Sequence, residues 1–186
     1  MKTDIIVITD RSGSMGAIKN DVIGGYNQFL RDQKEVEGEA RITFIQFDHE
    51  YQVLYSEIPL QDAPELTAET FVPRGSTALL DAVGITLDER LSRNPSWAEL
   101  VVMVIITDGE ENSSTKYDLP RVRALTTEAE GLGWKFIYLA ANQDAFNSAS
   151  MLGMQQPVAA NYTADSAGVA GAYGVASAST KAFRSS

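Results

Sequence analysis

The sequence contains no cysteine among its 186 residues, which excludes disulfide bonds, thiolate catalysis and cysteine-based zinc sites. Histidine is almost as scarce, because His49 is the only one. It lies between Asp48 and Glu50 in a short polar segment, where a solvated side chain is expected more than a catalytic one. A Ser-His-Asp triad is therefore not supported. A Gly-x-Ser-x-Gly elbow is absent as well, since Ser12 stands where that motif requires glycine.

Long apolar runs and excess positive charge are also lacking. No run approaches the roughly 20 residues of a membrane-spanning helix, and the chain enters its first apolar stretch at residue 4 without a signal segment. These features predict a cytoplasmic protein with no membrane partner. The net charge of −10 argues against a nucleic-acid partner, because phosphate binding needs a basic surface. The apolar content of 44% is that of an ordinary globular domain.

The apolar residues alternate between two periods along the chain, which predicts strands alternating with helices. Segments rich in apolar and β-branched residues predict strands at about 4–10, 41–47, 51–56, 100–107, 134–140 and 157–160. Three- and four-residue spacing predicts helices at about 17–35, 79–91, 117–131, 146–152 and 165–182. The segment 59–76 is expected to be mostly loop, with at most a short helix around 64–69.

The topology follows from two of these segments. The polar link 48–50 is short enough for a hairpin, so the strand 51–56 should be antiparallel and lie at a sheet edge. The run 100–107 is the most hydrophobic and is expected to be a central parallel strand. The fold class predicted is α/β: a doubly wound, Rossmann-like, mostly parallel sheet with one antiparallel edge strand and helices on both faces.

Glycine and proline mark several helix boundaries. Asn94-Pro95 should end the helix 79–91, and Pro120 should lie in the first turn of the helix 117–131. Gly153 should follow the end of the helix 146–152. Gly24-Gly25 should weaken the first helix, and close packing against the sheet would explain the pair. The large aromatic side chains are expected in the core rather than on a recognition surface: Tyr26, Phe29, Phe44, Phe47, Trp97 and Trp134.

The tail is distinct in composition. Residues 1–163 are predicted to form one domain, and residues 164–186 are rich in Ala, Gly and Ser. Bulky residues such as Val169 and Tyr173 recur within this tail. It is therefore predicted to be a helix that packs on or extends the domain, with its last residues disordered.

Three polar loops follow predicted strands or precede a helix. Asp10 ends the first strand, and Ser12 and Ser14 follow it. Thr77 lies just before the helix 79–91, and Asp108 follows the central strand. Each is most often a turn or N-cap residue when taken alone. Ligands of open α/β sheets, however, bind at the carboxyl ends of the strands. Two carboxylates and three hydroxyls at that edge form an all-oxygen set, which suits a hard divalent cation.

These strings resemble the metal-ion-dependent adhesion site (MIDAS) of the von Willebrand factor A (vWA) domain family. The resemblance lies in Asp10-Arg-Ser-Gly-Ser14, Thr77 and Thr107-Asp-Gly109, in matching order, and it spans nearly the whole chain. The strings Gly75-Ser-Thr-Ala-Leu79 and Ile105-Ile-Thr-Asp-Gly-Glu-Glu111 are more similar to small stand-alone bacterial and phage members than to integrin or matrix-protein members.

The resemblance implies a ligand arrangement. Ser12, Ser14 and, in one state, Thr77 would bind the metal directly, whereas Asp10 and Asp108 would hold it largely through water. Neutral hydroxyls leave most of the charge uncompensated, so the ion keeps an exchangeable water that a Glu or Asp of a partner protein can displace. Mg²⁺ fits this sparse set best, and Mn²⁺ or Ca²⁺ are alternatives.

Enzyme classes with a related fold fit less well. A magnesium-dependent phosphatase of the haloacid dehalogenase kind needs a second carboxylate where Ser12 stands. A response-regulator receiver needs a lysine after its last strand, where Ala140-Ala-Asn142 is found. A dinucleotide fingerprint is absent. Glu110 and Glu111 are general-base candidates by type, but their expected role is to lower the potential at the rim. The prediction is a non-enzymatic, metal-dependent protein-binding module, and the alternative is a structural or assembly subunit that needs no metal.

Overall fold

The computed structural model describes residues 1–93, 97–108 and 110–186. Six strands form one sheet in the order β3-β2-β1-β4-β5-β6. The strands are β1 (Thr3–Asp10), β2 (Ala40–Phe47), β3 (Tyr51–Pro59), β4 (Leu100–Thr107), β5 (Lys135–Ala141) and β6 (Val158–Tyr162). The helices are α1 (Lys19–Lys34), α2 (Leu79–Ser92), α3 (Leu119–Gly131), α4 (Ala145–Met151) and α5 (Ser166–Arg184), with short 3-10 helices η1 (Gly13–Ile18) and η2 (Leu60–Asp62).

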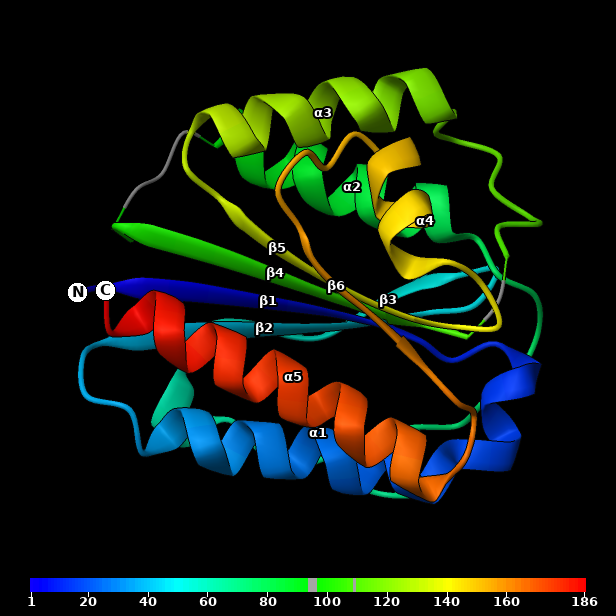
Figure 1. The fold of residues 1–186 in the computed structure, drawn as a ribbon, viewed down its shortest axis with the longest axis horizontal. Helices are drawn as coiled ribbons and strands as arrows, with labels where there is room; N and C mark the ends of the chain where they lie inside the picture. Colours follow the sequence, from blue (N-terminus) through cyan, green and yellow to red (C-terminus); the bar gives the residue numbers. More distant parts are fainter. Residues whose placement is uncertain (94–96, 109) are drawn as a thin grey trace.

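The sheet has the predicted topology. Only the β2–β3 pair is antiparallel, and β3 lies at an edge. Helices α1 and α5 cover one face, and α2, α3 and α4 cover the other (Figure 1). The predicted fold class is therefore confirmed. β1 and β4 are neighbours in parallel register, with Thr9 opposite Ile106, so Asp10 and Thr107 end at the same edge of the sheet.

The sheet separates two apolar cores. All eight residues of β1 are buried, as expected for a central parallel strand covered on both faces. Ile5 and Val7 pack in the core beneath α1 and α5, whereas Ile6 and Ile8 pack in the core beneath α2 and α3. This alternation fixes the direction of Asp10 and of the loop that follows it. Within the described part of the chain, no helix is long and apolar enough to cross a membrane.

The segment 59–76 is mostly loop, as predicted, and the short helix allowed around 64–69 is absent. The helix that the structure shows between β3 and α2 is η2, at Leu60–Asp62. Asn27 of α1 holds this segment, because its side chain accepts a hydrogen bond from Leu66 N at 2.8 Å and donates one to Leu66 O at 3.0 Å. Leu66 O is thus bonded to a side chain and not to the amide of residue 70, as a helix would require.

Gly25, the second glycine of the pair in α1, has a different cause from the one predicted. The helix runs without a break through Gly24 and Gly25. A Cβ atom on Gly25 would lie 2.3 Å from Cδ2 of Tyr173, a residue of α5. Close approach of α5, and not of the sheet, therefore requires glycine at position 25.

The C-terminal helix is ordered further than expected. α5 begins after Asp165, whose side chain accepts a hydrogen bond from Gly168 N at 2.7 Å. It extends to Arg184, two residues past the predicted end, and Arg184 Nη1 donates to Gln33 O at 2.8 Å. The expected disorder of the last residues is thus wrong as far as Arg184. The two chain termini lie at the same end of the molecule (Figure 1).

Most other local predictions hold where the structure describes them. Pro120 lies in the first turn of α3, and Gly153 follows Leu152, the C-cap of α4. Asn94-Pro95 lies outside the described residues. Four of the six aromatic residues predicted for the core are buried there: Tyr26, Phe29, Phe44 and Phe47. Trp97 and Trp134 are only half-buried. Trp134 packs against the core beneath α2 and α3, so the core prediction holds in part for Trp134 and is wrong for Trp97.

Candidate metal site

Asp10 occupies the centre of the loops at the carboxyl edge of the sheet. Its side chain is fully buried. Oδ1 accepts a hydrogen bond from Ser12 N at 2.6 Å, and Oδ2 accepts one from Thr107 Oγ1 at 2.8 Å. The same carboxylate therefore orders the turn that follows β1 and ties it to the end of β4.

The two serines lie on the turn that Asp10 orders. The hydroxyl oxygens of Ser12 and Ser14 are 3.3 Å apart, and Ser14 Oγ donates to Asp108 Oδ1 at 2.9 Å. Ser12 is buried and Ser14 is exposed. The turn is anchored by Met15, which is fully buried and whose amide donates to Ser12 O at 2.9 Å. Hydrogen bonds thus connect four of the five predicted ligands in one cluster.

Thr77 reaches this edge from a separate loop. Gly13 N donates to Gly75 O at 3.0 Å, which joins the Thr77 loop to the turn after β1. Gly75 has φ of +69°, and a Cβ there would lie 2.4 Å from His49 Nδ1, so a larger residue is excluded. Thr77 itself is buried. The structure therefore places Thr77 beside the loop of Ser12 and Ser14 through main-chain contacts.

Asn112 is a supporting residue that the sequence did not indicate. Thr77 N donates to Asn112 Oδ1 at 2.9 Å, and Asn112 N donates back to Thr77 O at 3.0 Å. This reciprocal pair ties the Thr77 loop to the segment that follows Asp108. The polar run after Asp108 is the sequence feature that could have indicated it, because Asn and Ser side chains commonly hydrogen-bond to backbone groups.

Other side chains hold the segment after β4 in place. Asp81 of α2 is buried, and its carboxylate accepts hydrogen bonds from Thr115 N at 3.0 Å and from Lys116 N and Tyr117 N at 2.9 Å. Glu111 accepts hydrogen bonds from Leu80 N and Ser114 N, at 3.3 and 3.2 Å. In addition to the role predicted for it at the rim, Glu111 therefore anchors this loop to α2.

The pKa of Asp108 is raised by its surroundings. Burial, followed by the negative charge of Asp10, raises the pKa of Asp108 to about 6, although the hydrogen bond from Ser14 acts in the opposite direction. Asp108 N lies 3.4 Å from Asp10 Oδ2. The guanidinium of Arg11, the nearest basic residue in sequence, is paired instead with Asp48 at 3.2 Å. A cation between the two carboxylates would relieve their repulsion.

The donor set fits a hard divalent cation. It consists of carboxylate and hydroxyl oxygens only, the ligand type that Mg²⁺ and Ca²⁺ prefer. In the described ranges there is no group of three or more His, Cys, Asp or Glu side chains that could hold a metal. A metal site at this edge therefore needs the hydroxyl oxygens as ligands in addition to the two carboxylates. Gly109, predicted as part of the motif, lies outside the described residues.

The comparisons with known proteins match the fold and not the sequence. Neither the protein-family models nor the curated proteins gave a match. The vWF domain of the type V pili tip protein Mfa5 from Porphyromonas gingivalis has a TM-score of 0.68 at 13% identity, over 97% of this chain and 95% of that one. A von Willebrand factor type A structure from Catenulispora acidiphila has a TM-score of 0.66 at 13% identity, over 97% of this chain and 43% of that one.

The chain has the fold of a von Willebrand factor A domain. A third neighbour, proximal thread matrix protein 1 from the mussel byssus, was solved with a zinc-occupied MIDAS motif; its TM-score is 0.68 at 12% identity, over 96% of this chain and 46% of that one. This chain thus spans less than half of the mussel and Catenulispora chains. At these identities the likeness to vWA domains is one of fold.

Proposed function

We propose that this vWA-fold protein is a metal-dependent protein-binding module. A divalent cation, Mg²⁺ in the first place, would be held by Asp10, Ser12, Ser14, Thr77 and Asp108. The observation that carries the proposal is the pair of adjacent carboxylates, Asp10 and Asp108, linked to two serine hydroxyls and paired with no basic side chain within the described residues.

The chemistry of this site favours docking over catalysis. Three of the five ligands are neutral hydroxyls, so the bound ion would keep most of its charge and an exchangeable water. A Glu or Asp side chain of a partner protein is the ligand that best replaces this water. The residue two positions after Asp10 is Ser12, which supplies no acid or base for phosphoryl transfer. The neighbours named above include a pilus tip domain and a byssus matrix protein, which is in keeping with a binding role.

The first test is metal binding by the intact chain. We expect isothermal titration with Mg²⁺ to give saturable, one-site binding, and a thermal midpoint that rises with Mg²⁺ and falls back when chelator is added. Thr77→Ala should weaken Mg²⁺ binding while the midpoint without metal changes little. Identical melting curves in Mg²⁺ and in chelator, together with no heat of binding, would reject the metal site.

The second test concerns the partner. An acidic peptide should bind only in the presence of the metal, and its amide counterpart, with Gln in place of Glu, should not bind. Peptide binding that is equal in Mg²⁺ and in chelator would favour the alternative function, a structural or assembly subunit with no metal requirement.

A further inference from the structure

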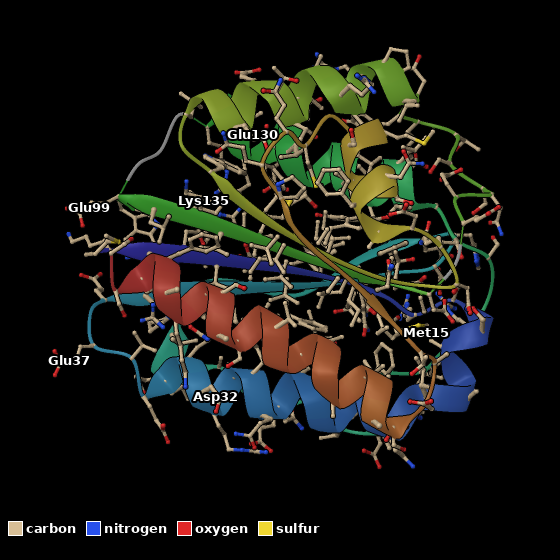
Figure 2. The ribbon with its side chains drawn as sticks, viewed as in Figure 1. Met15, Asp32, Glu37, Glu99, Glu130 and Lys135 are labelled. Carbon is tan, nitrogen blue, oxygen red and sulfur yellow. The ribbon has the colours of Figure 1, made fainter. Side chains whose placement is uncertain are left out.

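A cavity lies at the amino ends of the parallel strands, at the opposite end of the sheet from the candidate metal site. It has a volume of about 240 Å³. Its lining includes Asp4 near the start of β1, Glu99 just before β4 and Trp134 just before β5. Figure 2 shows Glu99 and Met15, the anchor of the metal-site turn, at opposite ends of the molecule. The metal-site proposal makes no use of this cavity.

The lining is charged, and its carboxylates are matched by cations of the chain. Glu57 pairs with Arg93 at 2.8 Å, and Glu99 lies 3.9 Å from the amino group of Met1. Asp4, Glu57 and Glu99 contribute carboxylates, and Arg90 contributes the one guanidinium among the lining residues that the structure describes. Arg90 Nη1 lies 2.6 Å from Asp4 Oδ2 and 3.4 Å from Glu57 Oε1. Asp4 is 5% exposed, and its second oxygen, Oδ1, has no hydrogen-bond partner within the described part of the chain. The cavity is therefore bordered by a buried acidic group whose hydrogen-bonding capacity is only partly used.

Aromatic surface completes the lining. Trp97 and Trp134 are both half-buried and both line the cavity. The guanidinium of Arg41 lies 4.5 Å from the centroid of the Trp97 ring, so this edge already contains one contact between an organic cation and an indole face. An indole face beside the unpartnered carboxylate oxygen of Asp4 is a favourable environment for an organic cation, which is attracted to the face and can donate to the oxygen.

The size of the cavity limits the ligand. Pockets for drug-sized ligands measure roughly 300–1,000 Å³, and this cavity is smaller at about 240 Å³. It fits a single guanidinium or ammonium group with a short aliphatic stem. A small metabolite and one Arg or Lys side chain of a protein segment both carry that chemistry.

We propose that this cavity is a binding site for an organic cation of the guanidinium or alkylammonium class. The unpartnered Oδ1 of Asp4 supplies the acceptor, Glu99 supplies a rim charge, and the indole of Trp134 supplies the aromatic face. The proposal does not depend on the metal site, so binding should be the same in Mg²⁺ and in chelator.

The chain contains its own reporter for this site, because its only two tryptophans both line the cavity. The probe is N-acetylarginine methylamide, titrated into the full chain at constant ionic strength while tryptophan emission is recorded. We expect a saturable change with a dissociation constant on the order of 1 mM. N-acetylcitrulline methylamide, which has nearly the same shape without the charge, is the matched control and should give no saturable change.

Two variants locate the binding. Glu99→Gln removes one exposed rim charge and should weaken binding about threefold, and Trp134→Leu should weaken it about fivefold, with Trp97 as the remaining reporter. Glu69→Gln, an exposed acid outside the lining, should leave binding unchanged. Circular dichroism identifies a variant that fails to fold, and Glu99→Gln keeps the test valid because Glu99 is exposed.

The outcomes separate cleanly. An equal response to the citrulline probe, a response that does not saturate, or equal effects of Glu99→Gln and Glu69→Gln would overturn the proposal. Titrations with choline and with the peptide acetyl-Ala-Arg-Ala-amide then identify the source of the cation. Tighter binding of the peptide supports a protein side chain as the natural ligand, and tighter binding of choline supports a small molecule.

Discussion

Ser14 Oγ donates a hydrogen bond of 2.9 Å to Asp108 Oδ1, although the two residues are 94 positions apart in the sequence. The bond crosses from the turn after β1 to the end of β4. It is possible because these two strands are neighbours in parallel register, so both chain segments leave the sheet at the same edge. The predicted ligands are therefore held together by the order of the strands.

Ser14→Ala tests this link. Because Ser14 is exposed, we expect the free energy of unfolding without metal to change by less than about 1 kcal/mol. The affinity for Mg²⁺ should fall about tenfold, because a proposed direct ligand is lost. Titration calorimetry and urea denaturation measure the two effects. Ser150→Ala, a change of the same type at an exposed position on α4, should alter neither; unchanged Mg²⁺ affinity in Ser14→Ala would contradict the ligand assignment.

Asn112→Ala tests the support of the Thr77 loop. The variant loses the acceptor of Thr77 N while both backbone groups of residue 112 remain. We expect a loss of about 1 kcal/mol of stability and a several-fold weaker affinity for Mg²⁺, since Thr77 is no longer held beside the other ligands. Amide hydrogen exchange of the Thr77 loop gives a direct readout. The control is Asn147→Ala on α4, also exposed, which should leave exchange at Thr77 as it is.

Gly25→Ala tests the close approach of α5 to α1. Alanine has the higher helix propensity, by about 1 kcal/mol, but its Cβ would lie 2.3 Å from the Tyr173 ring. We expect overpacking to dominate and the variant to lose about 1–3 kcal/mol of stability in urea denaturation. Gly24→Ala is the matched control, because a Cβ at Gly24 would meet no atom within 4 Å; it should stabilise the protein by up to about 1 kcal/mol. Equal effects of both substitutions would argue against the contact.

The pair of Asp32 and Ser177 predicts a pH-dependent contribution to stability. Ser177 Oγ donates to Asp32 Oδ2 at 2.5 Å, and this hydrogen bond is the main reason that the pKa of Asp32 is lowered. A lowered folded-state pKa stabilises the protein above the carboxyl's unfolded-state pKa of about 4. That contribution is lost as the pH falls through the lower folded-state value.

Ser177→Ala should therefore be less stable than the parent chain at pH 7, and the difference in unfolding free energy should shrink as the pH falls below about 4. Urea denaturation across pH 3–7 provides the measurement. Ser150→Ala serves as the control, with a difference from the parent chain that does not change with pH. A Ser177→Ala difference that stays constant over the same range would show that the hydrogen bond does not set the Asp32 pKa.

The sequence predicted the succession of strands and helices along the chain well, because the signals for these elements are local. Uninterrupted apolar runs at β1 and β4 reflect burial on both faces, and the short polar link between β2 and β3 leaves room only for a hairpin. Departures came where a distant side chain competed with local preference. Asn27 of α1 holds the backbone of Leu66 in the loop before α2, and Tyr173 of α5, not the sheet, accounts for Gly25.

For the site, the sequence by itself determined the chemical type of the oxygens and their place at the ends of strands. A run of β-branched residues that ends at Asp10 predicts a strand, so the carboxylate lies at the carboxyl end of that strand. Only the tertiary structure decided which groups support them. Asn112, Asp81 and Glu111 act through hydrogen bonds to backbone groups about 30 or more residues away, and the cavity at Trp134 is formed by the starts of several strands. Such pairings depend on how the sheet is ordered and packed, and a local pattern of residues carries no record of them.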